Sequence, residues 1–220
     1  MRRHFDSRYV EHATLADGRD VRLRLVRPTD KPLFEEALRR LSPESRYARF
    51  FAAKSAFTDA ELRYLTEVDQ ERHFALGAVT GKGRERRGLG VARFVALPEE
   101  PDVAEAAIAV TDDAQGQGLG RLLFLRLIAA ARERGIVRFR CDVLAQNDRM
   151  RDLLHALAPG ARDRSDGLTI GVDVPLLDVT AQAPAAEARG PLYRILELAA
   201  SGAVVVRRSE RELLAWLGAR

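Results

Sequence analysis

Six residues between a strand pattern and a long helical pattern constrain the fold more than any other part of the chain. The segment Gln115-Gly-Gln-Gly-Leu-Gly120 follows the apolar run IAVT closely and precedes the amphipathic stretch RLLFLRLIAAARERG. Glycines let the backbone approach a ligand with no Cβ in the way, and the first N–H groups of a helix point outward at the positive end of its dipole. The pattern predicts a strand–turn–helix unit that can hold a phosphate group, or else a plain tight connection.

The spacing of these glycines argues against two common phosphate-binding loops. A Walker loop requires G-x-x-x-x-G-K-[ST], but Gly120 is followed by Arg121 and Leu122. A dinucleotide-binding loop requires G-x-G-x-x-G, whereas the glycines here are spaced G-x-G-x-G. A kinase and a nicotinamide-dependent enzyme are therefore disfavoured.

Hydrophobic periodicity on both sides of this turn predicts a mixed α/β (α+β) layer structure. A hairpin is expected around Asp17-Gly18, with helices after Asp30, after Ser42-Pro43 and at the capping box Thr58 to Glu61. Strand patterns cover 73–80, 88–97, 103–111, 136–145 and 168–174, and helical patterns cover 121–135 and 148–157. The three consecutive strands predict an antiparallel meander, and the strand–turn–helix–strand order that follows predicts one parallel pair.

The composition of the chain changes at about residue 179. We expect a main domain over residues 1–178, an Ala/Pro linker over 179–190 and a small helix-and-strand appendage over 191–220. A segment of about 30 residues cannot form an independent hydrophobic core without disulfides or a structural metal. The appendage is therefore expected to pack on the main domain or on a second subunit, and the second arrangement would be a homodimer.

Charge and hydropathy exclude several classes of partner. Of the 220 residues, 36 are Lys or Arg and 32 are Asp or Glu, and the mean hydropathy is −0.22. Acidic and basic residues alternate, as on solvated helix faces, so we expect no nucleic-acid partner. No run approaches the roughly 18 apolar residues that cross a bilayer, and no secretory signal pattern opens the chain. We expect a cytoplasmic protein with no membrane partner.

Cysteine and histidine usage gives no indication of a metal site. Cys141 is the single cysteine, so it cannot form an internal disulfide or a multi-thiolate site. It lies within a strand pattern, where a small core residue is the expected role rather than a nucleophile. The four histidines show no ligand spacing, and we expect no metal.

Several motifs in a fixed order resemble a known family. The turn has the form Q-x-x-G-x-G at Gln115, Gly118 and Gly120, a strand ends in Arg27-Pro-x-Asp30, and Asn147 follows a later strand. With these motifs the chain, from about Val21 to Val174, resembles the GNAT N-acetyltransferases. The resemblance implies the GNAT fold: a mixed, mostly antiparallel sheet with a splayed parallel pair of central strands and helices on both faces.

Four further segments resemble the acetyltransferase domain of bacterial protein lysine acetyltransferases. They are LSPESRYARFF at 41–51, LTEVD at 65–69, AE-x-AI-x-V at 104–110 and N-x-x-M at 147–150. This likeness implies acetyl-CoA as the acyl donor and lysine acetylation as the reaction, with no metal cofactor.

The resemblance also assigns a cofactor-binding site. In it, backbone groups of Ile108 and Val110 bind the acetyl and pantetheine end, in a gap opened by a bulge in the strand 103–111. Asn147 orients the CoA chain through its side-chain amide, although an ordinary helix cap is an equal alternative. The pyrophosphate is held by the turn and first helical residues Gln115, Gly116, Gln117, Gly118, Leu119, Gly120 and Arg121.

Two residues are candidates for the chemistry itself. A lysine amine has a pKa of about 10.4 and needs a base at neutral pH. The resemblance implies that Glu105 is that base. Its apolar neighbours in the sequence predict a desolvated carboxylate with a raised pKa. The alternative is an exposed carboxylate on an edge strand. The Val110 N–H is the implied oxyanion donor. Many GNAT enzymes carry a tyrosine acid a turn or two beyond the asparagine, but Leu153-Leu-His155 stands here.

The sequence therefore predicts an acetyl-CoA-dependent N-acetyltransferase that acts on a primary amine, with a protein lysine side chain as the preferred acceptor. A small-molecule amine such as a polyamine, an aminoglycoside or an amino acid is the first alternative. The second is a GNAT-like module that binds acyl-CoA without turnover, as a sensor or interaction protein.

Overall fold

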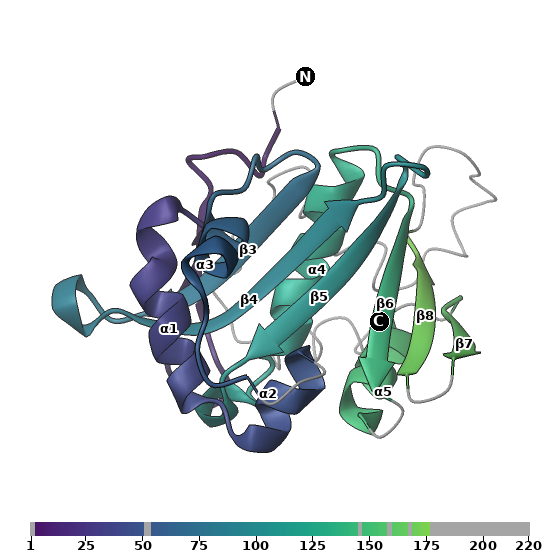
Figure 1. Ribbon diagram of the computed structural model, residues 1–220. Coiled ribbons are helices and arrows are strands. Elements are labelled where there is room, and N and C mark those ends of the chain that lie inside the picture. The colour runs from purple at the N-terminus through teal and green to yellow at the C-terminus, as the bar shows by residue number, and fades with distance from the viewer. Residues whose placement is uncertain (1–2, 51–53, 145–146, 158–159, 167–168, 177–220) are drawn as a thin grey trace, which may run out of the picture.

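The alternation of apolar residues along the strand patterns produces one mixed sheet with helices on both faces (Figure 1). The computed structural model describes residues 3–50, 54–144, 147–157, 160–166 and 169–176. Within these ranges eight strands follow the order β1-β2-β3-β4-β5-β6-β8-β7. The strands are β1 Val10–Thr14, β2 Asp20–Leu25, β3 His73–Thr80, β4 Arg87–Ala96, β5 Val103–Val110, β6 Arg138–Leu144, β7 Arg162–Asp166 and β8 Thr169–Pro175.

The helices form two layers. Helices α1 Lys31–Arg40, α2 Pro43–Phe50 and α3 Asp59–Thr66 belong to one layer, and α4 Leu119–Arg132 and α5 Asp148–Leu157 belong to the other. The expected capping box of α3 is confirmed, because the Glu61 N–H donates to Thr58 Oγ1 at 3.2 Å and the Thr58 N–H donates to Glu61 Oε2 at 2.8 Å. Single 3-10 turns lie at Pro28–Asp30, Gly83–Glu85 and Asp112–Ala114.

The predicted order of strands and helices is confirmed with one omission. All the ladders are antiparallel except β5–β6, which is the predicted parallel pair. Strand β7 was not predicted, because its sequence Arg-Asp-Arg-Ser-Asp has no apolar alternation. It forms through backbone pairing with β8, from Arg162 opposite Asp173 to Asp166 opposite Thr169.

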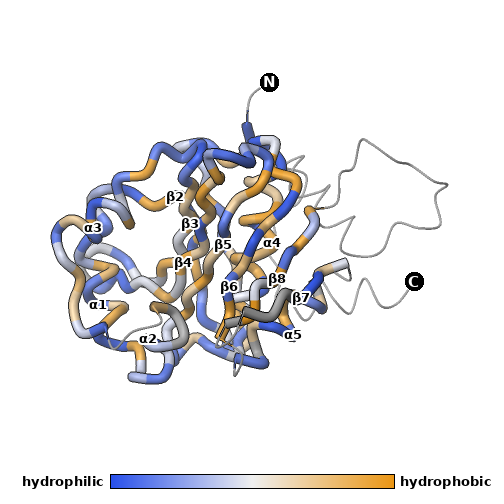
Figure 2. Tube along the Cα trace, turned by 45° about the vertical axis from the view of Figure 1, so that its right-hand side comes forward, coloured by the Kyte–Doolittle hydropathy of each residue, from blue (hydrophilic) through white to orange (hydrophobic). Residues whose placement is uncertain are grey.

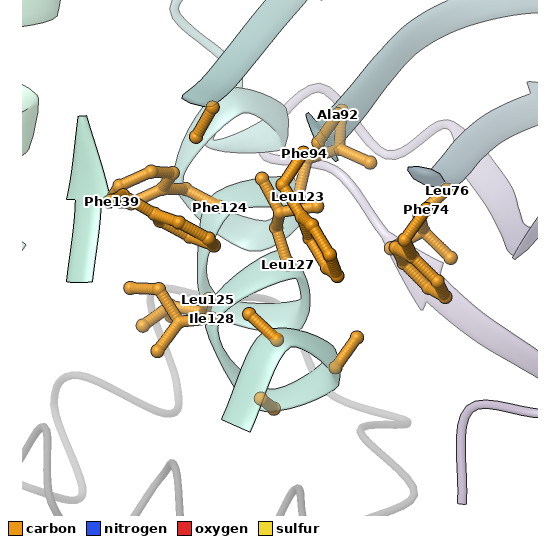
Figure 3. Close-up of a cluster of buried hydrophobic side chains, with 14 of the residues drawn as sticks. Phe74, Leu76, Ala92, Phe94, Leu123, Phe124, Leu125, Leu127, Ile128 and Phe139 are labelled. Carbon is orange, nitrogen blue, oxygen red and sulfur yellow. The ribbon is translucent and has the colours of Figure 1, made fainter. Parts of the chain in front are cut away.

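The core lies between the sheet and α4. Figure 3 shows Leu123 and Leu127 of α4 packed beside Phe94, with Phe124 beside Phe139. Ring centroids are 5.9 Å apart for Phe94 and Phe139 and 6.0 Å apart for Phe124 and Phe139. Figure 2 shows hydrophobic residues running through the central strands and α4. Burial of these large apolar side chains is the main source of the fold's stability.

Two buried ion pairs fasten the N-terminal hairpin to the rest of the fold. Arg126 of α4 donates to both carboxylate oxygens of Glu11 in β1, at 2.6 and 2.7 Å, and Glu11 also accepts from the Tyr9 hydroxyl. Arg24 of β2 donates to both oxygens of Asp30, at 2.7 Å each, and Asp30 accepts from the Arg27 N–H as well. The Arg-Pro-x-Asp motif thus has a structural role: both oxygens of the buried Asp30 carboxylate accept hydrogen bonds from protein groups.

The predicted boundary at about residue 179 lies outside the described residues. The main domain over 1–178, the linker over 179–190 and the appendage over 191–220 therefore remain predictions. Across the part of the chain that the structure describes, none of the helices has both the length and the apolarity to cross a bilayer.

Candidate functional site

The β5–β6 pair separates halfway along β5. Pairing covers only Val103 to Glu105 of β5, opposite Arg138 to Arg140 of β6, and the two strands diverge toward their arrowheads (Figure 1). Strand β6 pairs with β8 over its whole length on its other side, while β5 stays paired with β4 as far as Val110. The predicted splay of a central parallel pair is confirmed.

Backbone groups of β5 face this opening. The Thr111 N–H donates to the Leu89 carbonyl at 2.9 Å, so β5 residues with odd numbers bond to β4. Successive residues of a strand direct their N–H and C=O groups to opposite sides. Ile108 and Val110 therefore point their backbone groups toward the gap, where no strand within the described residues pairs with them. A chain carrying amides could bond there as a strand does.

The bulge expected in β5 is absent from its pairing with β4, and that prediction is wrong. The register runs without a shift from Ala104 opposite Ala96 to Val110 opposite Gly90. The gap arises because β6 turns away after Arg140. Regular alternation then holds, so Glu105, Ala107 and Ala109 share the face that α1 to α3 cover in part. Ile108 and Val110 share the α4 face.

The turn between β5 and α4 presents unbonded N–H groups at the start of the helix. Gly116 and Gly118 have φ angles of 73° and 84°, a left-handed conformation that favours glycine. The first helical bond runs from the Leu122 N–H to the Gly118 carbonyl at 3.0 Å. The N–H groups of Leu119 and Gly120 have no acceptor within the described residues. With the helix dipole behind them, they can receive an anionic oxygen.

Gly120 is not required by the packing of the protein. A Cβ added there would lie 3.8 Å from Val110 Cγ2 and 3.9 Å from Leu153 Cδ2, which are ordinary contacts. Its φ is not among the positive values of the chain. The bare backbone at this position therefore leaves space for a ligand rather than relieving strain.

Gln115 braces the turn through its side chain. Its Nε2 donates to Asp112 Oδ1 at 2.8 Å, to the Val110 carbonyl at 3.3 Å and to Ser45 Oγ at 3.3 Å. Asp112 also accepts from the Ser42 N–H and the Ser45 hydroxyl at the start of α2. These contacts tie the turn to α2. A direct contact of Gln115 with a cofactor stays a prediction.

Sequence reasoning missed this network because its members are distant along the chain. Ser42, Ser45 and Asp112 come together only when α2 lies over the end of β5, and an acidic residue after a strand is a weak signal by itself. The β1–β2 hairpin also supports the turn: the Ala16 N–H donates to the Gln117 carbonyl at 3.3 Å, and Arg19 Nη1 donates to Asp113 Oδ2 at 3.1 Å.

Glu105 lies at the point where the two strands part. It is the last β5 residue paired with β6, opposite Arg140, and it lies opposite Val95 on β4. Its side chain is exposed, so the predicted desolvation by apolar neighbours is wrong for this structure. Apolar residues next to it in sequence point to the other face. Its carboxylate has no hydrogen bond or ion pair with any described residue.

Asn147 adopts the helix-cap role that the sequence left open. Its Oδ1 accepts from the Met150 N–H at 3.2 Å, at the start of α5. The side-chain Nδ2 is the group that remains for a cofactor chain. Arg121 is half-buried in the first turn of α4. Contacts of Asn147 and Arg121 with a cofactor stay predictions.

The remaining histidine and cysteine candidates have structural surroundings. His155 Nε2 lies 2.8 Å from Asp163 Oδ1 of β7. Cys141 is buried in the core, and burial raises the pKa of its thiol to about 12, which confirms the predicted core role. Within the described ranges no group of three or more His, Cys, Asp or Glu side chains is placed to hold a metal ion.

The opened parallel pair thus lies beside a helix N-terminus with free amides, and the two together could accept an extended chain and an anionic group. Residues 33–158 match the model of the acetyltransferase (GNAT) family. The chain belongs to the GNAT family.

Two curated relatives are acetyltransferases. One, from Pseudomonas aeruginosa, is 34% identical over 158 residues, which are 71% of this chain and 84% of that protein. The other, acetyltransferase Pat of Mycolicibacterium smegmatis, is 37% identical over 138 residues, which are 62% of this chain but only 40% of that protein. The chain thus corresponds to less than half of the mycobacterial relative.

Solved structures agree with the fold. The GNAT domain of S. lividans PAT superposes with a TM-score of 0.69 at 25% identity, over 78% of this chain and 99% of that one. A cAMP-binding acyltransferase from Mycobacterium smegmatis gives a TM-score of 0.53 at 27% identity, over 90% of this chain and 56% of that one. This chain therefore spans little more than half of the longer acyltransferase.

Proposed function

We propose that this protein transfers an acetyl group from acetyl-CoA directly to a primary amine, and that a protein lysine side chain is its preferred acceptor. The observation that carries the proposal is the parting of β5 from β6 after Glu105, next to the free N–H groups of Leu119 and Gly120. The acetyltransferase relatives described above support the same reaction.

In this proposal the cofactor spans the opening. The pyrophosphate is received by the N–H groups of Leu119 and Gly120, with Gly116 and Gly118 shaping the turn and Arg121 close by. The pantetheine arm takes the place of a strand beside Ile108 and Val110. Asn147 Nδ2 donates to the arm from the β6 side of the gap.

The transfer step then needs a base and an oxyanion donor. Glu105 accepts the proton of the acceptor ammonium, directly or through a water, and the neutral nitrogen attacks the thioester carbonyl. The Val110 N–H stabilises the tetrahedral oxyanion. The C–S bond of the tetrahedral intermediate then breaks while the new C–N bond remains. The amide nitrogen loses its extra proton to water, and water delivers a proton to the departing thiolate, so that the products are the N-acetyl amide and the CoA thiol. His155 is directed to Asp163 and is not used.

Charges next to Glu105, on the paired part of β5 and β6, favour a protein acceptor over a small polycation. Arg138 and Arg140 of β6 each donate to a carboxylate oxygen of Glu100, at 2.9 and 3.1 Å. Arg140 also lies 3.8 Å from Asp173. The surface beside Glu105 thus mixes both signs, whereas a site for a free polyamine would be rich in unpaired carboxylates.

The test is mass spectrometry of a lysate treated with the protein and isotope-labelled acetyl-CoA. We expect labelled lysine side chains on proteins with the parent and at least a 100-fold lower rate with Glu105→Gln. Label confined to small amines would contradict the protein acceptor. Tight binding of acetyl-CoA in calorimetry without any labelled product would instead indicate a non-catalytic acyl-CoA-binding module.

A further inference from the structure

One carboxylate between β5 and α4 holds two separate segments of the chain. The Asp112 carboxylate accepts hydrogen bonds from the Ser42 N–H and the Ser45 hydroxyl at the start of α2, and from Gln115 Nε2 at 2.8 Å. Hydrogen bonds to an ionised group are stronger than those between neutral groups. Asp112 is two residues beyond Val110, whose N–H is the oxyanion donor of the proposed function. The Gln115 side chain is therefore fixed next to the proposed site of transfer.

The side chain of Gln115 has no N–H left for a phosphate group. A carboxamide nitrogen carries two hydrogens. Three protein acceptors surround Gln115 Nε2: Asp112 Oδ1 at 2.8 Å, the Val110 carbonyl at 3.3 Å and Ser45 Oγ at 3.3 Å. The other polar atom, Oε1, only accepts hydrogen bonds, and a phosphate oxygen has none to donate when it is ionised. The geometry of this side chain thus suits the positioning of protein groups better than the binding of a pyrophosphate.

The group that Gln115 positions is the residue with the oxyanion donor. In a strand, the N–H and the C=O of one residue point to the same side. Gln115 Nε2 bonds to the Val110 carbonyl, so it approaches Val110 from the side of the gap. The peptide group after Val110 is also held on its other side, because the Thr111 N–H donates to the Leu89 carbonyl at 2.9 Å. Gln115 therefore fixes the carbonyl of Val110 and leaves its N–H open to the gap.

The end of β5 needs this support because β6 does not provide it. Pairing with β6 stops at Glu105, so among the described residues Val110 has a neighbouring strand only on its β4 side. A strand end with few bonds opens more readily than the middle of a sheet. An error of about 1 Å in the placement of a reacting or stabilising group can lower a rate about 100-fold. At Val110, Gln115 takes the place of the bond that β6 makes earlier in β5.

We propose that Asp112 and Gln115 are positioning residues for the transfer step: Asp112 orients the Gln115 side chain, and Gln115 holds Val110 so that its N–H faces the tetrahedral oxyanion. The inference rests on the proposed function, which places the thioester carbonyl at the Val110 N–H. Both side chains act through Val110. Their loss should therefore lower the rate of transfer and leave the affinity for acetyl-CoA unchanged.

The test measures rate and affinity separately in Gln115→Leu. The single-turnover rate with a lysine peptide at saturating acetyl-CoA should fall about 10-fold to 100-fold, because the oxyanion donor is no longer held in place. The Kd for acetyl-CoA in calorimetry should stay within about 2-fold of the parent value, as expected when only the transition state is affected. The calorimetric stoichiometry gives the fraction of folded sites, to which each rate is normalised.

Two substitutions of Asp112 distinguish positioning from a structural role. Asp112→Leu leaves Gln115 without its strongest acceptor and should slow transfer about as much as Gln115→Leu does. Asp112→Asn keeps a carbonyl oxygen for Gln115 and for the Ser45 hydroxyl, but its amide group meets the Ser42 N–H, which is also a donor. This variant should lower the denaturant midpoint and keep the rate within about 3-fold of the parent. A purely structural role would make rate and stability fall together.

Asp113→Leu is the matched control for Asp112→Leu. Asp113 lies in the same 3-10 turn, is exposed and bonds to Arg19 and Arg40 instead of Gln115. Its rate and its Kd for acetyl-CoA should equal those of the parent. The double variant Asp112→Leu/Gln115→Leu should be no slower than either single variant, because Asp112 acts through Gln115.

The outcomes separate this inference from the function on which it rests. If Gln115→Leu keeps the parent rate, or if its Kd for acetyl-CoA rises at least about 10-fold, the positioning role is wrong and acetyl transfer stands. If the rate losses of the two single variants multiply in the double variant, Asp112 does not act through Gln115 and the inference is also wrong. If the parent transfers no acetyl group, the proposed function fails and the inference fails with it.

Discussion

Two regions of this molecule differ in whether their polar groups have hydrogen-bond partners within the protein. At and just after the N-terminal hairpin, Glu11 and Asp30 are buried carboxylates. Each accepts two hydrogen bonds from the guanidinium of one arginine. At the β5–α4 junction, Glu105 is exposed without a partner among the described residues, and backbone N–H groups of β5 and α4 face the gap. The polar groups of the first region are bonded within the protein, and those of the second region are available to a ligand.

The contrast implies that stability and function can be altered separately. A buried ion pair is costly to break, because the remaining charge stays in a medium of low polarity. An exposed carboxylate or an unbonded amide contributes little to folding. Substitutions in the hairpin region should therefore change unfolding, and substitutions at the junction should change binding or turnover.

The largest effect is expected for Glu105→Gln. Loss of a general base lowers the rate about 100-fold to 10,000-fold, so kcat at pH 7 with a lysine peptide should fall within that range. Because the side chain is exposed, the denaturant midpoint should stay at the parent value. A variant that retains the parent rate would remove Glu105 from the reaction.

The second effect concerns the hairpin region. Arg126→Met leaves Glu11 buried without its partner and should cost about 3–5 kcal/mol of unfolding free energy in urea titrations. The double variant Glu11→Leu/Arg126→Met should recover most of that loss, since an apolar pair of similar volume is tolerated. Affinity for acetyl-CoA should not change in the folded fraction. If Arg126→Met were as stable as the parent, the buried ion pair with Glu11 would not contribute to the stability of this region.

The third effect is at the start of α4, where Gly120→Asp should separate binding from folding. The new carboxylate lies in the first helical turn and replaces a glycine, so the unfolding free energy should rise by about 0.3–1 kcal/mol. The same charge would repel a pyrophosphate and deny it N–H contacts worth about 1.5–3 kcal/mol each. The Kd for acetyl-CoA in calorimetry should therefore rise at least about 100-fold.

Ala60→Glu is the matched control for that variant. It places an acid at the corresponding position of α3, after Thr58 and Asp59, on an exposed residue. Its affinity for acetyl-CoA should equal that of the parent. A similar loss of affinity in both variants, or in neither, would place the pyrophosphate elsewhere.

The smallest effect is a pH dependence at His73. Burial, with the nearby Arg93 charge, lowers the pKa of His73 to about 4 from its usual 6.5. A depressed histidine pKa contributes stability above pH 6.5, and that contribution is lost as the pH falls toward 4. Because the ring is half-exposed, the loss between pH 7 and 4.5 should be only about 1 kcal/mol.

Urea titrations at pH 7 and 4.5 check this effect. The parent should lose about 1 kcal/mol more than His73→Gln over that interval. Asp69, which bonds the His73 N–H, is retained in both proteins and opposes the shift. Equal pH dependence of the two proteins would show that the pKa of His73 is not lowered by folding.

Local patterns predicted the elements of the fold well, and contacts between distant segments explain what they missed. The strand 73–80 and the helix 148–157 are observed with the predicted bounds, because periodicity and caps are local properties. Strand β7 has no such pattern and depends on β8.

The site shows the same division. The sequence predicted a turn before a helix at the glycines, because the conformation of the turn follows from its residues. Its role in holding a phosphate came from the family resemblance and stays a prediction. The exposure of Glu105 depends on its lateral neighbours Val95 and Arg140 rather than on its sequence neighbours. The bracing role of Gln115 depends on where α2 lies, and a sequence reading cannot place α2.

The most direct test of the open junction is amide hydrogen exchange in β5, measured residue by residue with NMR. Without cofactor, the N–H groups of Ile108 and Val110 should exchange at least about 100-fold faster than those of Ala107 and Ala109, which bond to β4. Saturating acetyl-CoA should slow Ile108 and Val110 and leave the other two unchanged. Uniform protection along β5, or no change at Ile108 and Val110 on adding acetyl-CoA, would contradict the account.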